Sequence, residues 1–487
     1  MVAFAVILAG AILSVSARAA AQSRFDAARP DVLVVGGTPA GVAAAIAAAR
    51  RHQRVTLVAA GRDLGGILVD GFMNQWDLNV TDDGASVERG IFADMYDRLG
   101  NAFEPDAAAQ TFADMVAREP NIIVRYGMAA IGVAPSNWPD GRHVDAVMFK
   151  SAGSNMTTIV RAPEIVDATD SADIAAMAGA RYDRGRQDTG VDQRMQAVTE
   201  MFTLDGVDWD TVQRGYDAAQ FGPGRALPKT AWGYAKLMHD YKPVQPNAIV
   251  RDQNLAHMPD GSVTVNAIDI VGIDGLDPQQ VEQAKRNTTV EAPHLVDFLR
   301  AHLPGFENAR IGKYAPDVYV RETRHIDGVE RLTSKDVWDG KIPDDSIALA
   351  SYPMDVHPVD IGDTPAFAST RHVYGIPFGA LVPKGLDNVI LAGPAISASH
   401  EASGSARIVA TTIEEGEAAG AAAAYANAHH LDFTQIASNH ERIDVLRRDL
   451  ADNGATVGGP LVEVGAPSAV RKKSERRTRA DAVTGAS

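Results

Sequence analysis

The tripeptide Asp355-Val356-His357 is the best candidate for proton chemistry in the sequence. Strand side chains alternate with a period of two, so on an extended segment the acid and the histidine project from the same face. Histidine titrates near neutral pH and can act as a general acid or base. A histidine held structurally by its neighbour is the alternative. In an extended segment 351–357 the residues expected to face the core are Tyr352, Met354 and Val356.

Two arginines are candidates for holding an anionic or carbonyl oxygen. Arg324 follows a polar stretch, and Arg407 lies in Ser405-Ala406-Arg407, where a long helix to about residue 427 is expected to begin. At a helix start, backbone N–H groups and a guanidinium would point at the same ligand. Further polar candidates, which position alone does not rank, are Arg321, His325, His400 and Glu401.

A glycine-rich turn follows the first apolar run of the chain, Asp31 to Val35. Its sequence is Gly36-Gly37-Thr38-Pro39-Ala40-Gly41, and an alanine-rich stretch follows to residue 51. A strand, a tight turn and a helix N-terminus in this order form a binding site for a pyrophosphate. Thr38 stands where the middle glycine of the dinucleotide-binding pattern is usual. A turn that simply joins a strand to a helix is the alternative.

The second apolar run, Val55 to Ala59, completes a βαβ unit. In dinucleotide-binding units an acid at the end of this strand binds the ribose, and here that place is Ala59. Arg62 and Asp63 follow in the loop, so either Asp63 reaches back or the ribose is held without an acid. An arginine in place of the acid also suits the phosphate of NADP.

These elements predict an α/β fold: a Rossmann-type parallel sheet with helices, and an inserted lobe of mixed helices and strands. Further strands are expected at 122–126, 144–149, 158–162, 164–167, 374–381 and 388–392, and a helix at 172–180. The predicted divisions are a first part at 31–190, a substrate lobe at 191–349, a return segment at 350–430 and a C-terminal helical segment at 431–465.

Several stretches resemble the FAD-dependent oxidoreductases whose nucleotide domain is of the glutathione-reductase or succinate-dehydrogenase type, in their exported bacterial branch. The stretches are 34–45, Leu64-Gly65-Gly66-Ile67-Leu68, Val166-Asp167-Ala168-Thr169-Asp170 with Asp173, 351–357, and 374–420. Ala59 and Asp170 depart from the family pattern.

The resemblance implies FAD as cofactor and assigns residues to it. Gly65 and Gly66 would pass the pyrophosphate and ribityl chain, Thr169 would lie on the adenine side, and Gly393 would return the chain to the isoalloxazine. Asp170 and Asp173 could instead cap a helix. The small residues that would let the last long helix pack closely are Gly416, Ala419, Gly420 and Ala423.

The implied reaction is a hydride exchange between a small organic substrate and flavin N5, with a separate electron acceptor. His357 with Asp355 would move the proton. One alternative is an NADP-dependent oxidoreductase without flavin. Another, suggested by Thr38, Ala59 and Asp170, is a degenerate flavoprotein fold that acts as an exported binding protein.

Composition sets limits on function and location. The net charge of −16 argues against a nucleic-acid-binding surface, and the chain has no cysteine and no recognisable metal pattern. Residues 1–21 read as a signal peptide that is cleaved, so a periplasmic or secreted protein without stable membrane insertion is expected. A polar linker at 22–30 precedes the first strand, and a basic tail at 466–487 is expected to be disordered.

Overall fold

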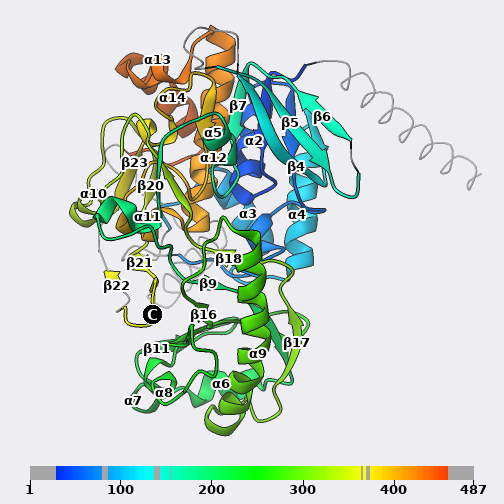
Figure 1. Cartoon of the computed structure of the whole chain (residues 1–487), viewed down its shortest axis with the longest axis vertical. Coiled ribbons are helices and arrows are strands. Elements are labelled where there is room, and N and C mark those ends of the chain that lie inside the picture. The colour runs from blue at the N-terminus through cyan, green and yellow to red at the C-terminus, as the bar shows by residue number, and fades with distance from the viewer. Residues whose placement is uncertain are drawn as a thin grey trace, which may run out of the picture.

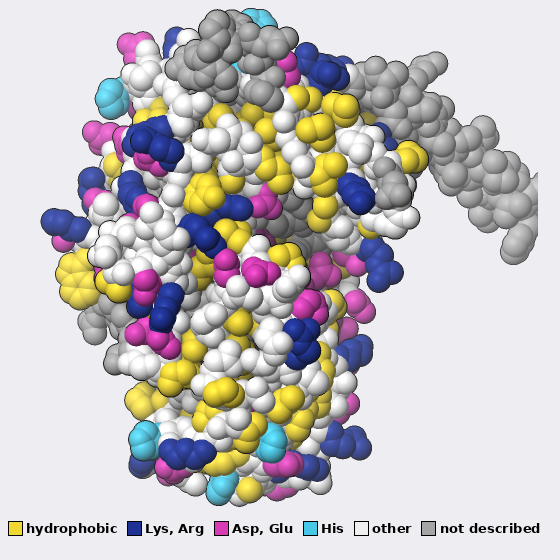
Figure 2. All heavy atoms as spheres, viewed as in Figure 1, with side chains coloured by type: hydrophobic (Ala, Val, Ile, Leu, Met, Phe, Trp, Pro, Cys, Tyr) yellow, Lys and Arg dark blue, Asp and Glu magenta, His cyan; other side chains and the backbone are white. Residues whose placement is uncertain are grey.

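The computed structural model describes residues 29–78, 86–135, 143–154, 156–363, 366–368 and 373–458. The predicted signal peptide and basic tail lie outside these ranges. No helix in the described ranges has the length and apolar character needed to cross a membrane. Figure 2 shows acidic and basic side chains interspersed over one face of the molecule.

The centre of the first domain is a five-stranded parallel sheet in the order β24-β7-β1-β2-β3. Val32 pairs in register with Val55 on one side and with Glu164 on the other. The four residues of β1 are all apolar and buried, as expected for a strand covered on both faces. The strands are β1 (Val32–Val35), β2 (Val55–Val58), β3 (Ile122–Arg125), β7 (Glu164–Asp167) and β24 (Val389–Leu391).

Helices α2 (Pro39–Arg50) and α12 (Val409–His429) pack closely against each other beside this sheet (Figure 1). A Cβ on Gly416 would lie 2.1 Å from the Ala40 carbonyl oxygen, and one on Gly420 would lie 2.1 Å from that of Ala44. The two glycines therefore allow contact between backbones, as the small-residue pattern predicted. Other elements of this domain are α3 (Ile91–Leu99), α4 (Pro105–Ala117), α5 (Asp173–Met177), α13 (Phe433–Ala437), α14 (His440–Asp452) and the antiparallel sheet β4 (Met128–Pro135), β5 (Val144–Ser151) and β6 (Thr157–Val160).

The second lobe is built on a six-stranded antiparallel sheet and a four-stranded one, crossed by the long helix α9 (Pro278–His302) (Figure 1). The six strands are β11 (Gly224–Ala226), β12 (Thr230–Gly233), β14 (Gln253–His257), β15 (Val263–Asn266), β10 (Phe202–Asp205) and β17 (Arg310–Tyr314). The four are β13 (Ala248–Ile249), β16 (Asp269–Ile270), β9 (Val198–Thr199) and β18 (Tyr319–Val320). The short helices are α6 (Trp209–Gly215), α7 (Ala218–Phe221) and α8 (Ala235–Met238).

The apolar core of this lobe draws on buried residues from Val198 to Val318 only. Ile326, Leu332 and Ile347 pack instead in the core of the first domain, although the sequence analysis assigned them to the lobe. The connecting elements are β8 (Tyr182–Arg184), β19 (Arg324–Ile326), α10 (Ser334–Asp339), β20 (Ser346–Ala350), β21 (Met354–Val356), β22 (Ala366–Ala368), β23 (Tyr374–Pro377) and α11 (His400–Ala406).

The helix expected to begin at Ser405 is in fact two helices, and that prediction was wrong. Helix α11 ends at Ala406, and α12 begins at Val409 after Ile408, which is extended with φ −64° and ψ 134°. Arg407 therefore lies in the break between two helices. Its guanidinium donates hydrogen bonds to Tyr319 and to the Asp355 carbonyl.

Candidate functional site

The glycine-rich turn is packed so tightly that side chains are excluded at three positions. A Cβ on Gly36 would lie 2.1 Å from the Ala168 carbonyl oxygen, and one on Gly41 would lie 2.0 Å from that of Gly36. Gly36 also has φ +123°, and a Cβ on Gly37 would meet the Ala59 Cβ at 2.6 Å. The turn thus brings β1, α2 and β7 into direct backbone contact, as the dinucleotide-binding pattern requires.

Thr38 replaces a glycine but fits the turn as the N-cap of α2. Its Oγ1 accepts a hydrogen bond from the Gly41 N–H and donates one to the Ala168 carbonyl, each 3.0 Å long. The hydroxyl is therefore turned inward, and Pro39 at the first helical position has no N–H to satisfy. The substitution stabilises the turn.

A cavity of about 90 Å³ opens on the outer side of this turn. It is lined by Thr38, Pro39 and Ala40 from the turn, by Gly66 and Ile67, and by residues of the lobe and of α12. Gly65 and Gly66 have φ of +114° and +44°, a conformation that favours glycine. A glycine cradle beside a helix N-terminus suits the phosphate and ribityl part of FAD. The other residues that line the cavity are Asp170, Asp317, Val318, Tyr319, Val320, Pro394, Arg407, Val409 and Thr412.

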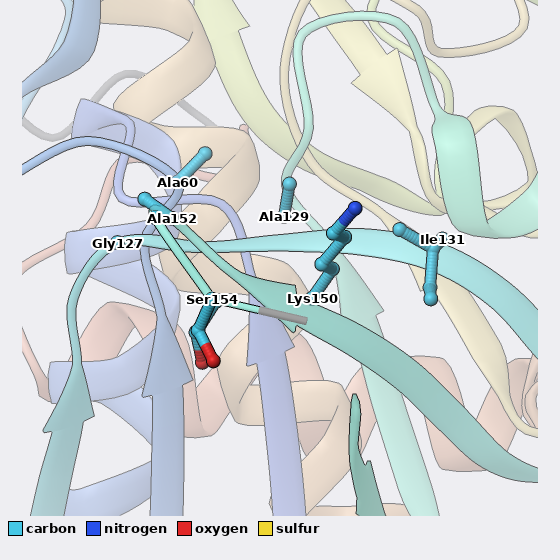
Figure 3. Close-up of a pocket in the computed structure, with 9 residues that line it drawn as sticks. Ala60, Gly127, Ala129, Ile131, Lys150, Ala152 and Ser154 are labelled. Carbon is cyan, nitrogen blue, oxygen red and sulfur yellow. The ribbon is translucent and has the colours of Figure 1, made fainter. Parts of the chain in front are cut away.

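Ala59 lies at the end of β2, where the sequence lacks a ribose-binding acid. It is buried, with its Cβ directed at Gly37. Beside it, an open pocket of about 440 Å³ runs from Ala60 along β4 and β5 (Figure 3). Figure 3 shows Ala129, Ile131 and Lys150 on these strands. The pocket adjoins the place expected for adenosine and includes none of the residues proposed for catalysis.

Thr169 is engaged within the turn after β7. Its Oγ1 donates to Asp167 (2.6 Å) and accepts from the Asp173 N–H (2.7 Å). Asp173 also accepts a hydrogen bond from Arg324, so it pairs with a cation as well as starting α5. Asp170 instead lines the cavity and remains exposed at its surface, and partial loss of solvation, with Asp317 and Asp173 nearby, raises its pKa.

Gly393 follows β24 with φ +112°, and a Cβ there would meet no atom within 4 Å. Its N–H donates to the Glu415 Oε2 over 3.2 Å. Glu415 is fully buried on α12, and burial raises the pKa of its carboxyl well above the usual range. The return turn is therefore fixed to α12 by a buried carboxyl group.

His357 is held between two carboxylates. Its Nδ1 lies 2.7 Å from the Asp269 Oδ2 of the lobe, and its Nε2 lies 3.2 Å from the Asp355 Oδ2. Both ring nitrogens of His357 are therefore engaged by carboxylate oxygens. Burial opposes ionisation of both acids, but His357 and nearby arginines hold the pKa of Asp269 and of Asp355 below the usual range. This geometry holds His357 between a carboxylate of the lobe and a carboxylate of the return segment.

Arg407 and Arg321 extend this cluster around Tyr319. The Arg407 Nη1 donates to the Tyr319 hydroxyl, and its Nη2 donates to the Asp355 carbonyl over 2.8 Å. Arg321 lies 4.7 Å from the Tyr319 ring centre and pairs with Asp269 over 3.3 Å. These six residues, Asp269, Tyr319, Arg321, Asp355, His357 and Arg407, are called the charge cluster below.

Asp77 is a member of the site that the sequence analysis missed. It is half-buried, and burial and nearby Asp355 raise its pKa to about 6 against the opposing effects of Arg407, Arg321 and His357. Asp77 also lines a small cleft with residues of β14 and β15. No spacing or motif marks this acid, because only the fold brings residue 77 next to residue 355. Tyr352, expected to face the core, is half-buried, and burial and nearby Asp77 raise its pKa.

Arg324 is held apart from the charge cluster. Its Nη1 donates to the Ser171 carbonyl and to Asp173, each over 2.7 Å, and its guanidinium lies over the Tyr182 ring.

His325 and His400 form a separate buried group, each 2.7 Å from the Glu322 Oε1. Among the predicted catalytic residues, the fold therefore unites Asp355, His357 and Arg407. No group of metal-ligating side chains is found in the described residues.

A parallel nucleotide-binding sheet with a glycine cradle and an adjacent charge cluster defines an α/β nucleotide-dependent enzyme. A family model described as FAD dependent oxidoreductase matches residues 31–450, and the chain belongs to this family. Its cofactor is FAD, as the resemblance implied. No match to a curated protein is found.

Solved structures similar to this chain include a reductase-like protein, a monooxygenase and a halogenase. A geranylgeranyl bacteriochlorophyll reductase-like protein from Thermoplasma acidophilum shares 13% identity over 87% of this chain and 83% of that chain, with a TM-score of 0.42. The p-nitrophenol 4-monooxygenase PnpA from Pseudomonas putida shares 12% over 92% and 98%, with a TM-score of 0.43. The myxobacterial halogenase CndH shares 12% over 86% and 79%, with a TM-score of 0.43.

Proposed function

We propose that the chain oxidises or reduces a small organic substrate by hydride exchange with FAD, at the junction of the two domains. One observation carries this proposal. Arg407 and Tyr319 line the cavity that begins at the glycine-rich turn, and the same two residues belong to the charge cluster. Groups able to orient a polar substrate thus lie at the end of the predicted FAD groove.

FAD supplies, when bound, a site at N5 that accepts or donates a hydride. The chain must then hold the substrate carbon in place and move one proton. Asp77 suits the proton transfer better than His357, because a base works best when its pKa lies near the working pH, and both ring nitrogens of His357 already contact carboxylates. The charge cluster has the role of an anchor that fixes Arg407 and Asp355.

The direct test is the absorption spectrum of the purified protein, followed by anaerobic addition of candidate substrates. A flavin spectrum that bleaches with substrate supports the proposal. Family membership favours FAD over the NADP alternative. A colourless protein that gains no thermal stability from added FAD would instead support the binding-protein alternative, because a ligand specific to the native state must stabilise it.

The role of Asp77 is tested by Asp77→Asn, with Asp240→Asn as a control. Asp240 is well exposed on the lobe, with 78% of its side chain accessible. In the oxidative direction, flavin reduction should become faster as pH rises through about 6, where Asp77 ionises. In Asp77→Asn the rate of flavin reduction should no longer rise with pH in this range. The rate itself should fall roughly 10²- to 10⁴-fold, the usual contribution of a general base. An unchanged pH profile in Asp77→Asn would exclude Asp77 as the base.

A further inference from the structure

The six-stranded sheet of the lobe presents a row of side chains with unused hydrogen-bonding groups. Arg225 on β11 pairs with Trp232 on β12, Trp232 pairs with Asn254 on β14, and Asn254 pairs with Asn266 on β15. Directly opposed residues of neighbouring strands point to the same face. These four residues, called the polar row below, therefore cross four strands side by side.

The opposite face of the same strands is core, which fixes the direction of the polar row. Ala231, Leu255 and Val265 alternate with its members and are completely buried in the lobe's apolar core. Trp232 in contrast is 47% exposed. An indole ring at that exposure is not needed for packing and leaves a flat apolar surface in water.

A segment of the first domain covers the neighbouring part of this face and lies beside the polar row. The buried Asn74 donates to the Thr264 hydroxyl of β15 over 3.0 Å, and Asp77 shares a cleft with Asn254 and Asn266. The polar row thus starts at the proposed base and leads away from it. Within the described residues, the side chains of Asn254 and Asn266 have no hydrogen-bond partner in the protein.

We propose that the polar row is the substrate-recognition surface and that the substrate is a carbohydrate. This inference rests on the proposed function, since it takes Asp77 as the reacting end of the site. An amide both donates and accepts, which matches hydroxyl groups that do the same. A flat indole matches the apolar C–H face of a sugar ring, much as aromatic side chains bury flat apolar surface elsewhere.

The dimensions and charges of the polar row favour a neutral sugar longer than one ring. Neighbouring strands are about 4.8 Å apart, so Trp232 and Asn266 are separated by roughly 10 Å. Three of the four members are uncharged, and the cations of the charge cluster are already paired with Asp269 and Asp355. Among the described residues, the cations that act on Asp77 are therefore already engaged by carboxylates, which disfavours a small anion as ligand. Arg225 at the outer end can donate to further hydroxyls.

The test is binding of neutral disaccharides to the flavin-loaded protein, with cellobiose, maltose and lactose as probes and calorimetry as readout. At least one should bind, and Trp232→Ala should weaken it roughly tenfold while Trp232→Phe retains most of the affinity. Trp338→Ala is the matched control, because Trp338 is 56% exposed on α10, far along the chain from the row. Asn254→Ala should weaken binding as well.

The outcomes separate this inference from the proposed function. Sugar binding that depends on Trp232 but never bleaches the flavin would support the recognition surface and reject the proposed redox reaction. Bleaching by a non-sugar, with no disaccharide bound, would overturn the carbohydrate inference and keep the redox proposal. Equal losses in Trp232→Ala and Trp338→Ala would also overturn it, because a specific surface must distinguish these two exposed indoles.

Discussion

The imidazole of His357 lies 2.7 Å from the Asp269 carboxylate, which joins the return segment of the FAD domain to strand β16 of the lobe. Asp355 holds the other ring nitrogen. His357 therefore links the two domains through two carboxylates, and the sequence analysis had already paired it with one of them, Asp355. Its proposed role is to fix the position of the lobe relative to the FAD groove.

Removing either acid of this link should destabilise the protein. Asp269→Asn leaves buried cations without their partner, which costs roughly 3–5 kcal/mol for a buried pair. Asp183→Asn breaks the half-exposed pair with Arg331 and should cost about 1 kcal/mol or less. Urea unfolding of both variants gives the comparison. Equal losses for the two would show that Asp269 is not held in a buried pair.

Gly41→Val should abolish retention of FAD. A Cβ at this position would meet the Gly36 carbonyl oxygen at 2.0 Å, so α2 must move away from the turn. Gly362→Val is the control, because a Cβ there meets nothing within 4 Å. Flavin content after gel filtration, with circular dichroism to verify folding, measures the effect. Full flavin content in folded Gly41→Val would contradict the assignment of the turn.

Ala59→Glu should tighten FAD binding without changing the substrate. Ala59 lies against Gly37, so a carboxylate there lies beside the turn and can accept hydrogen bonds from ribose hydroxyls. A hydrogen bond to a charged group contributes roughly 1.5–3 kcal/mol, or up to about a hundredfold in affinity. Titration of the apoprotein with FAD measures it. If Asp63 already reaches the ribose, Asp63→Ala weakens FAD in the parent and Ala59→Glu restores it.

Stability should fall as pH rises from about 5 to 8, because several buried carboxyls keep their protons in the folded state. Burial raises the pKa of Glu88 and of Glu417 to about 7 and that of Glu164 to about 8. The unfolded chain loses these protons near pH 4.3, so between the two pKa values the folded state binds more protons and stability declines. Below pH 4 the low pKa values of Asp269 and Asp355 make stability fall as pH falls. Protonation of these two acids in the folded state removes the charges that pair with His357 and the arginines.

Glu88→Gln tests how much one of these buried carboxyls contributes to the decline in stability with pH. The shift of Glu88 from 4.5 to about 7 corresponds to roughly 3 kcal/mol lost between these pH values. Glu88→Gln should therefore flatten the decline in melting temperature, and Glu441→Gln on exposed α14 should not. The same decline in wild type and Glu88→Gln would mean that Glu88 is ionised in the folded protein.

Export is proposed from the N-terminal segment. The apolar run Val2 to Val15, followed by small residues, predicts a mature chain that starts between Ala20 and Gln22 outside the cytoplasm. N-terminal sequencing of the protein from culture fractions measures this. Retention of Met1 on cytoplasmic protein would contradict it.

The sequence by itself determined the nucleotide-binding half of this protein, because the signals there are local. An apolar run, a glycine-rich turn and an alanine-rich helix are contiguous, and steric exclusion of side chains at Gly36 and Gly41 links sequence directly to backbone geometry. Strand β7 was predicted at its observed bounds for a similar reason, since a short buried parallel strand is a continuous apolar run.

Only the tertiary structure decided what surrounds the candidate site. Asp77, Asp269 and Asp355 are separated by many residues, and no periodicity relates them, so their approach depends on how the lobe packs against the FAD domain. The sequence pattern also did not predict the break between the two helices at Arg407, because Ile408 and Val409 fit a helix and an extended backbone equally well. The sequence paired His357 with Asp355, and only the tertiary structure brings a second carboxylate, that of Asp269 in the lobe, to its other ring nitrogen.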